Sequence, residues 1–349
     1  MGLLMANKRI AGLDGIRAIG ILLVLMTHGM GPHWAGAAAG VDIFFALSGW
    51  LIAGLLVEKG HLAASVFKAF YQNRLVRLYP ALLTVVAVVT AAAWFTTINF
   101  TKALAEATAS VLYAYPVYSY WFPKILWGHM WTLSMEWYFY LVFPPMLYLA
   151  ARWNRKRAFR SLLLVVWCLT SAVVIASSIA HNGQLGAESL LRVSAIALGA
   201  WLRLRPQALD KVSNPTPRLT LVATAAFLAL LVASTLYPVL IGPTYIAAGI
   251  LGLVYIRAVY SEEQTFVRKA LDSREMVWIG SISYEIYLWH FPLLILANSV
   301  IGPVNGLKTL VVYAVSLVLA HLTHRIWLAP QRALRRKISK GLTSAPPSE

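Results

Sequence analysis

Long apolar stretches dominate this sequence and follow one another along nearly its whole length. Eleven of them lie at 13–30, 37–57, 78–98, 103–119, 130–150, 161–180, 189–202, 219–236, 239–259, 277–297 and 306–328. A helix needs about 20 mostly apolar residues to cross the hydrocarbon core of a bilayer. Because 59% of the residues are hydrophobic and 12% are charged, the composition excludes a disordered chain and argues against a soluble globular fold. We predict an all-α fold, a polytopic transmembrane helical bundle.

The basic residues indicate which stretches cross the membrane. The chain has 30 Lys and Arg against 13 Asp and Glu, a formal net charge of +17. With a cytoplasmic N-terminus and ten crossings, 26 of those 30 basic residues lie on the cytoplasmic side, as the positive-inside rule requires. Residues 103–119 do not fit this alternation, and we expect a re-entrant or peripheral helix there. The asymmetry explains the basic composition without nucleic acid, so no nucleic-acid partner is expected.

The domain organisation follows from the same pattern. We expect a single membrane-embedded domain over 1–340 and a disordered cytoplasmic tail over 341–349. Both termini are expected in the cytoplasm, with the chain in the cytoplasmic (inner) membrane. The single cysteine, Cys168, cannot form a disulfide within the chain. No HExxH, CxxC or GxxxxGK[ST] motif occurs, so neither a metal site nor ATP hydrolysis is expected.

Three ionisable residues share one face of the first apolar stretch. The spacing from Arg17 to His28 brings the two side chains within about 20° on a helix, and Asp14 lies about 40° from His28. Ionisable residues within a membrane span are costly and usually functional. A histidine titrates near neutral pH and is a natural general base. The alternative is that Arg17 meets lipid headgroups and that each residue is satisfied locally.

Two carboxylates in later stretches are further candidates. Glu136 lies among aromatic residues, where it could orient a catalytic histidine or form a structural ion pair or a hydrogen bond to a tyrosine. Asp42 begins the second stretch, where an N-cap of a helix is the competing interpretation. Ser48 and Gly49 are interpreted as residues that allow close helix packing.

Arginine and histidine side chains occur near the ends of other stretches. Arg74 and Arg77 are three residues apart and share a helix face. Paired guanidinium groups suit phosphates, although topogenic charge or lipid headgroup binding is the simpler interpretation. His290 follows Tyr284 in a later stretch, where an interfacial aromatic belt is the alternative to a role in function.

Five motifs in order resemble the acyltransferase-3 family of integral-membrane acyltransferases over nearly the whole chain. They are GLDGIRAIGILLVLMTH with Arg17 and His28, GVDIFFALSGWLI, RLVRLYPAL, WTLSMEWYFYLVFP with Glu136, and SISYEIYLWHFPL. Two departures occur: Trp50 replaces the more usual Phe, and WLAPQR lacks the Glu that often precedes Pro in the last helix. The resemblance covers the membrane domain, with no appended esterase-like domain. Transfer is therefore expected to finish within the membrane domain or on a partner.

The resemblance implies acyl transfer, usually of acetyl, from acetyl-CoA to a hydroxyl of a cell-surface or exported carbohydrate. It implies His28 as general base, with Glu136 and Asp14 balancing the imidazole charge. It implies that acyl-CoA is bound by Arg17, Arg74 and Arg77. It implies that the acceptor is bound by Asp42, Trp131, Tyr284 and His290. The acceptor would be a carbohydrate or lipid-linked glycan, and membrane lipids and polysaccharide-assembly proteins would be partners.

Several alternatives stay open. The acceptor could be a small lipid or an antibiotic, and transfer could be direct or pass through an acyl-histidine. A transporter or flippase would also place polar residues along an intramembrane path. Cleavage of a thioester distinguishes the enzyme from the transporter.

Overall fold

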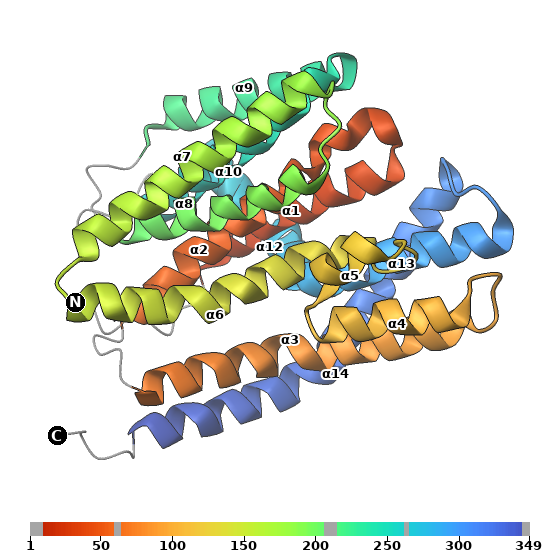
Figure 1. The fold of residues 1–349 in the computed structure, drawn as a ribbon, viewed down its shortest axis with the longest axis horizontal. Coiled ribbons are helices and arrows are strands. Elements are labelled where there is room, and N and C mark those ends of the chain that lie inside the picture. The colour runs from red at the N-terminus through yellow and green to blue at the C-terminus, as the bar shows by residue number, and fades with distance from the viewer. Residues whose placement is uncertain (1–9, 59–63, 206–214, 262–264, 344–349) are drawn as a thin grey trace. The chain divides into compact units, whose positions relative to one another are not determined.

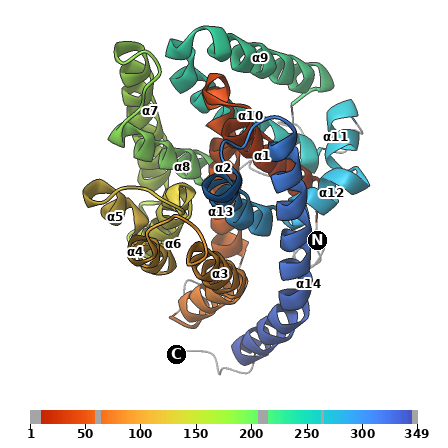
Figure 2. The same cartoon turned by 90° about the vertical axis from the view of Figure 1, so that its right-hand side faces the viewer.

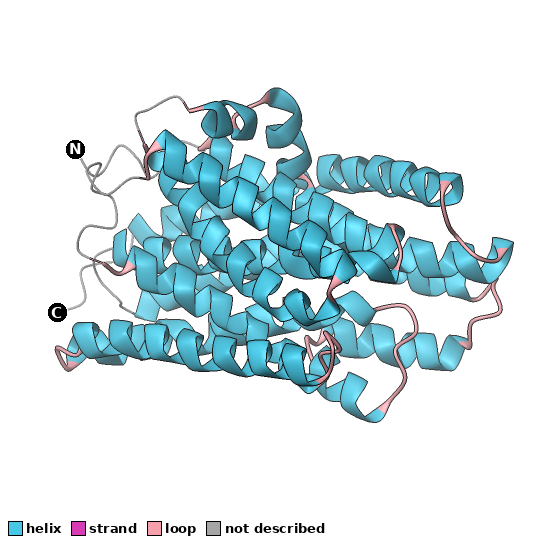
Figure 3. Ribbon diagram, turned by 90° about the horizontal axis from the view of Figure 1, so that it is seen from above, coloured by secondary structure: helices cyan, strands magenta, loops and turns pink. Residues whose placement is uncertain are grey.

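The regular structure of this chain is helical throughout the residues described, 10–58, 64–205, 215–261 and 265–343, in a computed structural model (Figure 3). The elements in chain order are α1 (Ala11–Gly29), η1 (Pro32–Ala39), α2 (Gly40–Glu58), α3 (Ala64–Ala93), α4 (Phe100–Val111), α5 (Tyr115–Trp121), η2 (Gly128–Met130), α6 (Trp131–Arg152), α7 (Lys156–Ala180), η3 (Ala187–Val193), α8 (Ser194–Arg203), α9 (Pro217–Leu236), η5 (Pro238–Leu240), α10 (Ile241–Tyr260), α11 (Phe266–Leu271), α12 (Arg274–Ser281), α13 (Ser283–Ile301) and α14 (Leu307–Thr343). The predicted all-α class is confirmed.

Within these residues, 7 helices are long and apolar enough to cross a membrane. They lie at 11–29, 34–57, 66–93, 156–180, 217–236, 238–260 and 307–338. α12 and α13 meet at a bend of 66° and could form one further span together. A multi-pass membrane protein is therefore supported, whereas the predicted count of ten crossings is not confirmed. Apart from this bent pair, two predicted crossings are missing from the set: α6 is long enough but not apolar enough, and α8 has only 10 residues.

The stretch at 103–119 is divided between two short helices. α4 has 12 residues and α5 has 7, so neither reaches the length of a span. Between them the backbone of Tyr113 adopts a positive φ of 54°, which ends α4. The absence of a single crossing here agrees with the expectation from the charge pattern.

A buried carboxylate fixes the chain around these two helices. Glu106 is fully buried and accepts hydrogen bonds from the Tyr115 hydroxyl at 3.0 Å and from the backbone N–H groups of Ile125 and Leu126 at 3.0 and 2.7 Å. Burial, and next the Glu106 carboxylate, raises the pKa of Tyr115, so its hydroxyl stays a donor at neutral pH. Glu106 thus organises the loop before α6.

The chain forms two compact units, each assembled from separate segments. The first unit contains 1–53 and 160–283, and the second contains 54–159 and 284–349. The single domain expected over 1–340 stays a prediction. The predicted tail begins at 341, but α14 continues to Thr343, and residues 344–349 lie outside the described part. The N-terminal charges Lys8 and Arg9 also lie outside it.

The first unit is built around α1, α2, α8 and α10 (Figure 2). Its core contains fully or almost fully buried side chains such as Ile16, Ile43 and Ile256. α2 and α8 approach closely at Gly49 and Gly199, where a Cβ on either residue would collide with a backbone carbonyl of the other helix. The interpretation of Gly49 as a packing residue is therefore correct. This close contact fixes the position of α8, the helix that directly follows η3.

In the second unit, α3 and α14 lie side by side and run antiparallel (Figure 1). The Trp327 Nε1 atom donates to the Thr84 hydroxyl at 3.0 Å, and the Gln331 amide donates to the Arg77 carbonyl at 3.3 Å. As the residue numbers rise along α14, those of the residues that they contact on α3 fall. The next turn of α14 therefore lies beside the turn of α3 that precedes Arg77.

Candidate active site

His28 lies in the last turn of α1, in the first unit. Its imidazole is half-buried and hydrogen-bonds the backbone of Val24, one turn earlier. A carbonyl acceptor fixes the proton on the ring nitrogen that faces it, and the other nitrogen is then the basic one. The ring is therefore oriented by its own helix, as a general base must be.

Asp14 and Arg17 form an ion pair at the other end of α1. The Arg17 Nη1 atom lies 2.6 Å from the Asp14 Oδ1 atom, and Asp14 is buried. In one continuous helix the 14 residues from Asp14 to His28 correspond to about 21 Å along the axis. The expected direct support of His28 by Asp14 needs correction, because Asp14 instead holds Arg17. The alternative interpretation from the sequence, in which each of these residues finds its partner locally, describes this ion pair.

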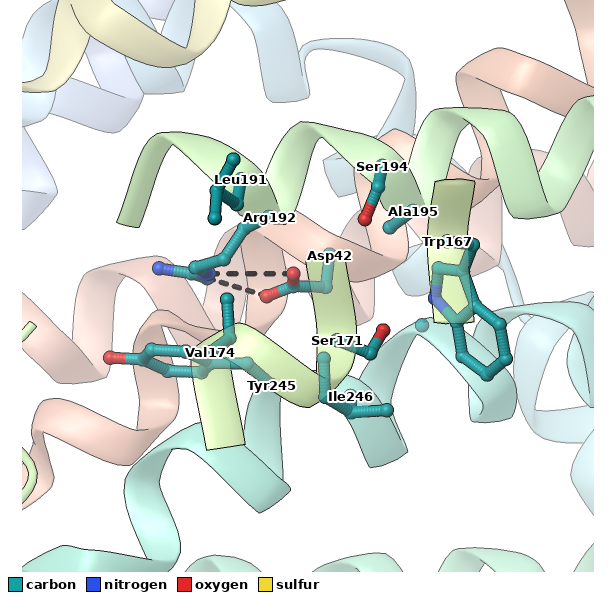
Figure 4. A pocket seen from close by; sticks show the side chains of 11 residues that line it. Asp42, Trp167, Ser171, Val174, Leu191, Arg192, Ser194, Ala195, Tyr245 and Ile246 are labelled. Atoms are coloured by element: carbon teal, nitrogen blue, oxygen red, sulfur yellow. Dashed lines mark hydrogen bonds and ion pairs between the residues drawn. The ribbon is translucent and has the colours of Figure 1, made fainter. Parts of the chain in front are cut away.

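Asp42 lies in the first turn of α2 and is paired with Arg192 of η3 (Figure 4). The Arg192 Nη2 atom lies 2.5 Å from the Asp42 Oδ2 atom and donates to the Ala38 carbonyl at 2.7 Å. The guanidinium carbon lies 3.6 Å from the ring centre of Tyr245. Asp42 does not form the N-cap considered above, since α2 begins at Gly40.

The Asp42–Arg192 pair borders a small pocket among α2, α7, α8 and α10. The volume of this pocket that a water-sized sphere can enter is about 0 Å³, far below that of a ligand pocket. Both charges are almost fully buried, with exposed fractions of 1% for Asp42 and 4% for Arg192. This arrangement is that of a satisfied buried ion pair, and the predicted role of Asp42 at the acceptor stays a prediction.

Arg74 and Glu136 lie in the second unit, on α3 and α6. The buried Arg74 guanidinium lies over the rings of Phe70 and Tyr140, 5.3 and 5.0 Å from their centres. The Tyr140 hydroxyl donates a 2.6 Å hydrogen bond to Glu136. The Glu136 charge also attracts Arg74. The hydrogen bond to a tyrosine, one of the alternatives for Glu136, is therefore observed.

Arg77 lies on the same helix as Arg74 and is half-buried. The arginines at 74 and 77 are close enough to repel each other electrostatically. Within the described residues, no carboxylate forms an ion pair with Arg77, in contrast to Arg192. Paired guanidinium groups of this kind can bind a phosphate group.

His290 and Tyr284 lie on α13 and are held by backbone carbonyls. The His290 Nδ1 atom lies 2.8 Å from the Tyr287 carbonyl, so the proton is on Nδ1 and Nε2 is the basic nitrogen. The Tyr284 hydroxyl donates to the Leu78 carbonyl at 3.0 Å. Trp131, the first residue of α6, is half-buried.

A histidine that the sequence did not single out lies beside His290. The rings of His129 and His290 have their centres 5.4 Å apart, and both side chains are buried. The Tyr287 hydroxyl donates to the His129 carbonyl at 2.6 Å and lies 2.5 Å from the Thr132 hydroxyl. The position of His129 just before the WTLSMEW segment was the available signal. Arg192 was likewise signalled as an arginine within an apolar stretch.

The predicted contact between His28 and Glu136 joins residues of different units and stays a prediction. Among the residues that the structure describes, no group of three or more His, Cys, Asp or Glu side chains could hold a metal ion.

The chain is similar to known proteins over nearly its whole length. The acyltransferase-3 family model, described as an acyltransferase domain, matches residues 10–325. Peptidoglycan O-acetyltransferase OatA of Listeria monocytogenes is 28% identical over 94% of this chain and 56% of the relative. O-acetyltransferase OatA of Staphylococcus aureus NCTC 8325 is 27% identical over 91% of this chain and 56% of the relative. The chain thus spans somewhat more than half the length of these curated relatives. No solved structure matches it.

Proposed function

Because this chain belongs to the acyltransferase-3 family, we propose that it is a membrane-bound O-acetyltransferase. It moves an acetyl group from cytosolic acetyl-CoA to a hydroxyl of a cell-surface or exported carbohydrate. The observation that carries this proposal is the family match over residues 10–325, which include every residue assigned to the reaction. A relative named peptidoglycan O-acetyltransferase supports a glycan as the acceptor.

The proposed chemistry is the attack of an acceptor hydroxyl on the thioester carbonyl. A carbon–oxygen bond forms, the carbon–sulfur bond breaks, and CoA leaves as a thiolate. His28 accepts the hydroxyl proton and passes it to the thiolate, so the enzyme returns to its starting state. The hydrogen bond of His28 to the Val24 backbone supports this role because it fixes the tautomer before substrate arrives.

Glu136 balances the positive charge that develops on His28 during transfer. Its position is supported by the hydrogen bond from Tyr140 and by the attraction to Arg74. Asp14 contributes through Arg17, its ion-pair partner, and not by contact with His28.

The donor and the acceptor use different side chains. Arg74, Arg77 and Arg17 hold the phosphate-bearing end of acetyl-CoA, supported by the orientation of Arg74 between two aromatic rings. The acceptor path is formed by Trp131, Tyr284, His290 and Asp42. The protein lies in the cytoplasmic membrane with both termini inside, beside polysaccharide-assembly proteins.

The proposal is tested by feeding labelled acetyl-CoA to membranes that contain the wild type, His28→Ala, His28→Gln or the control His181→Ala. We expect label in a glycan with the wild type and the control, and a loss of about 10²–10⁴ in rate for both His28 variants. His181 is an exposed histidine at the end of α7, so its loss tests for a general effect of histidine removal.

The pH profile sharpens the same test. Only the neutral imidazole accepts a proton, so the rate of transfer should fall as pH drops through the pKa of His28. An active His28→Gln variant would show that His28 positions the acceptor and that the base lies elsewhere, with Glu136 the next candidate. A wild type that labels no acceptor would overturn the function itself.

A further inference from the structure

The contact between α3 and α14 continues beyond the two hydrogen bonds already described. Trp327 and Gln331 of α14 bond Thr84 and the Arg77 carbonyl of α3. The next residue on that face of α14, four positions after Gln331, is Arg335. Four residues advance a helix by about 6 Å, so Arg335 comes beside the turn of α3 that contains Arg74 and Arg77.

The charges agree with this placement. Arg335 lies within electrostatic range of both Arg77 and Arg74. Glu136 attracts Arg74, whereas neither Arg77 nor Arg335 forms an ion pair with a carboxylate in the described part of the chain. Three guanidinium groups thus converge from two helices, and only one of them has an acidic neighbour. We call Arg74, Arg77 and Arg335 the α3–α14 arginine cluster.

The Arg335 side chain also carries a donor without an acceptor. Its Nε atom is inaccessible to solvent and has no hydrogen-bond partner. A buried donor without a partner lowers stability, and so does the repulsion between neighbouring cations. A bound anion with several acceptor oxygens would remove both unfavourable effects.

The geometry points to a phosphomonoester site at the α3–α14 arginine cluster, and we propose that it takes the 3′-phosphate of the acyl-CoA donor. A phosphomonoester carries a charge of about −1.5 to −2 near neutral pH and three acceptor oxygens. Each guanidinium can donate two parallel hydrogen bonds to such a group. The assignment of Arg335 rests on the proposed function for the identity of the donor.

A lipid headgroup offers related chemistry, but other arginines of α14 are better placed to meet it. Arg332 and Arg336 are exposed, whereas Arg335 is half-buried and lies toward α3. A lipid phosphodiester also carries a single negative charge and fewer free oxygens than a phosphomonoester. The cluster therefore fits the nucleotide end of CoA better than the headgroup of a surrounding lipid.

The test measures binding of CoA and of 3′-dephospho-CoA to the full-length protein in phosphatidylcholine nanodiscs, by calorimetry. Arg335→Gln is compared with the wild type and with Arg332→Gln, which removes an equal charge from an exposed position of the same helix. For Arg335→Gln we expect the affinity for CoA to fall by about 10-fold or more. The affinity for 3′-dephospho-CoA should change by less than about twofold, as should both affinities of Arg332→Gln.

A second variant separates binding from folding. Arg335→Lys keeps the charge but loses the planar fork, so its affinity for CoA should lie between those of the wild type and Arg335→Gln. The thermal unfolding temperature of Arg335→Gln should equal or exceed that of the wild type, because a like charge is removed from the cluster. A lower unfolding temperature for Arg335→Gln with unchanged affinity for CoA would overturn the assignment and indicate a structural role.

The remaining outcomes are distinct. An equal loss of affinity for CoA and 3′-dephospho-CoA would overturn the phosphomonoester assignment. If phosphatidylglycerol in the nanodisc stabilises the wild type but not Arg335→Gln, and both bind CoA equally, the cluster binds a headgroup and the proposal is wrong. If the wild type binds no CoA at all, the proposed donor is wrong as well. If the wild type binds CoA and Arg335→Gln binds it equally well, only the assignment of Arg335 is wrong.

Discussion

Two groups of arginines in this protein lie in opposite electrostatic environments. In the first unit, Arg192 has a carboxylate at 2.5 Å, a backbone carbonyl at 2.7 Å and an aromatic ring at 3.6 Å. In the second unit, Arg335 lies within electrostatic range of Arg77 and Arg74. The protein itself supplies the acceptors for the first charge, whereas in the second group neither Arg77 nor Arg335 forms an ion pair with a described carboxylate. A buried arginine is therefore a candidate for ligand binding when its carboxylate partner is missing.

The largest effect on stability should come from removing one partner of the Asp42–Arg192 ion pair. Asp42→Ala leaves the Arg192 charge buried without a carboxylate, and we expect a loss of about 3–5 kcal/mol in the free energy of unfolding. Chemical unfolding of the purified protein in detergent measures this. CoA affinity of the folded fraction should not change.

The double variant Asp42→Leu, Arg192→Met is the control, since it removes both charges and keeps the volume. Replacement of a buried ion pair by apolar residues is often neutral or stabilising, so most of the lost stability should return. A stable Asp42→Ala protein that has lost acetyl transfer would contradict this comparison and show that Asp42 acts at the acceptor and contributes little to stability.

The second effect tests whether a satisfied charge in the other unit behaves in the same way. Glu106→Ala removes the acceptor of the Tyr115 hydroxyl and of two backbone N–H groups. We expect a loss of about 3 kcal/mol in the free energy of unfolding, since hydrogen bonds to charged groups are strong and the donors stay buried. Glu106→Gln keeps an acceptor oxygen and should lose less. Wild-type stability in Glu106→Ala would show that water replaces the carboxylate.

The third prediction concerns Arg77 of the α3–α14 arginine cluster. Arg77→Ala should reduce the affinity for acyl-CoA by about 10- to 150-fold, because one charge-assisted interaction is lost. Its free energy of unfolding should stay equal or rise, because repulsion from the neighbouring arginines disappears. Binding and unfolding measured on the same preparation test both statements. Reduced membrane insertion with unchanged affinity would mean that Arg77 is only a topogenic charge.

The smallest effect on stability should come from substitutions of Tyr245, whose ring lies beside the Arg192 guanidinium. Tyr245→Phe loses the hydrogen bond to the Ala35 carbonyl but keeps the ring, and should cost about 1 kcal/mol of stability. Tyr245→Leu also loses the cation–π contact and should cost about 2 kcal/mol more. Thermal unfolding of the two variants gives the difference. Equal stability of the two variants would show that the ring contributes packing alone.

Part of the fold was predictable because it depends on composition and local pattern. Apolar stretches of span length predict helices, and the break at 103–119 followed from its charges and length. The crossing count was not predictable in the same way, because α6 mixes apolar with polar and aromatic residues and α8 is short. The interpretation of α14 also missed its length, because its last turns are polar and show no apolar run.

The candidate site was predictable only as a set of residues. The sequence singled out His28, Glu136 and Arg74 because ionisable groups are expensive in a membrane. It could not pair them, since Asp14 has Arg17 as its partner and Asp42 has Arg192, 150 residues away. His129 was missed because its only signal, a single histidine before an aromatic segment, is a weak one.

The sequence by itself determined the helical membrane class, the family and the residues that carry charge into the helices. Each of these depends on residue type and on spacing within one segment. The tertiary structure alone decided which charges have partners, because a carboxylate from a distant helix makes Arg192 a structural residue. The approach of α14 to α3 likewise brings Arg335 within electrostatic range of Arg74 and Arg77. Coulomb energy falls with distance in space, and distance along the chain does not determine it.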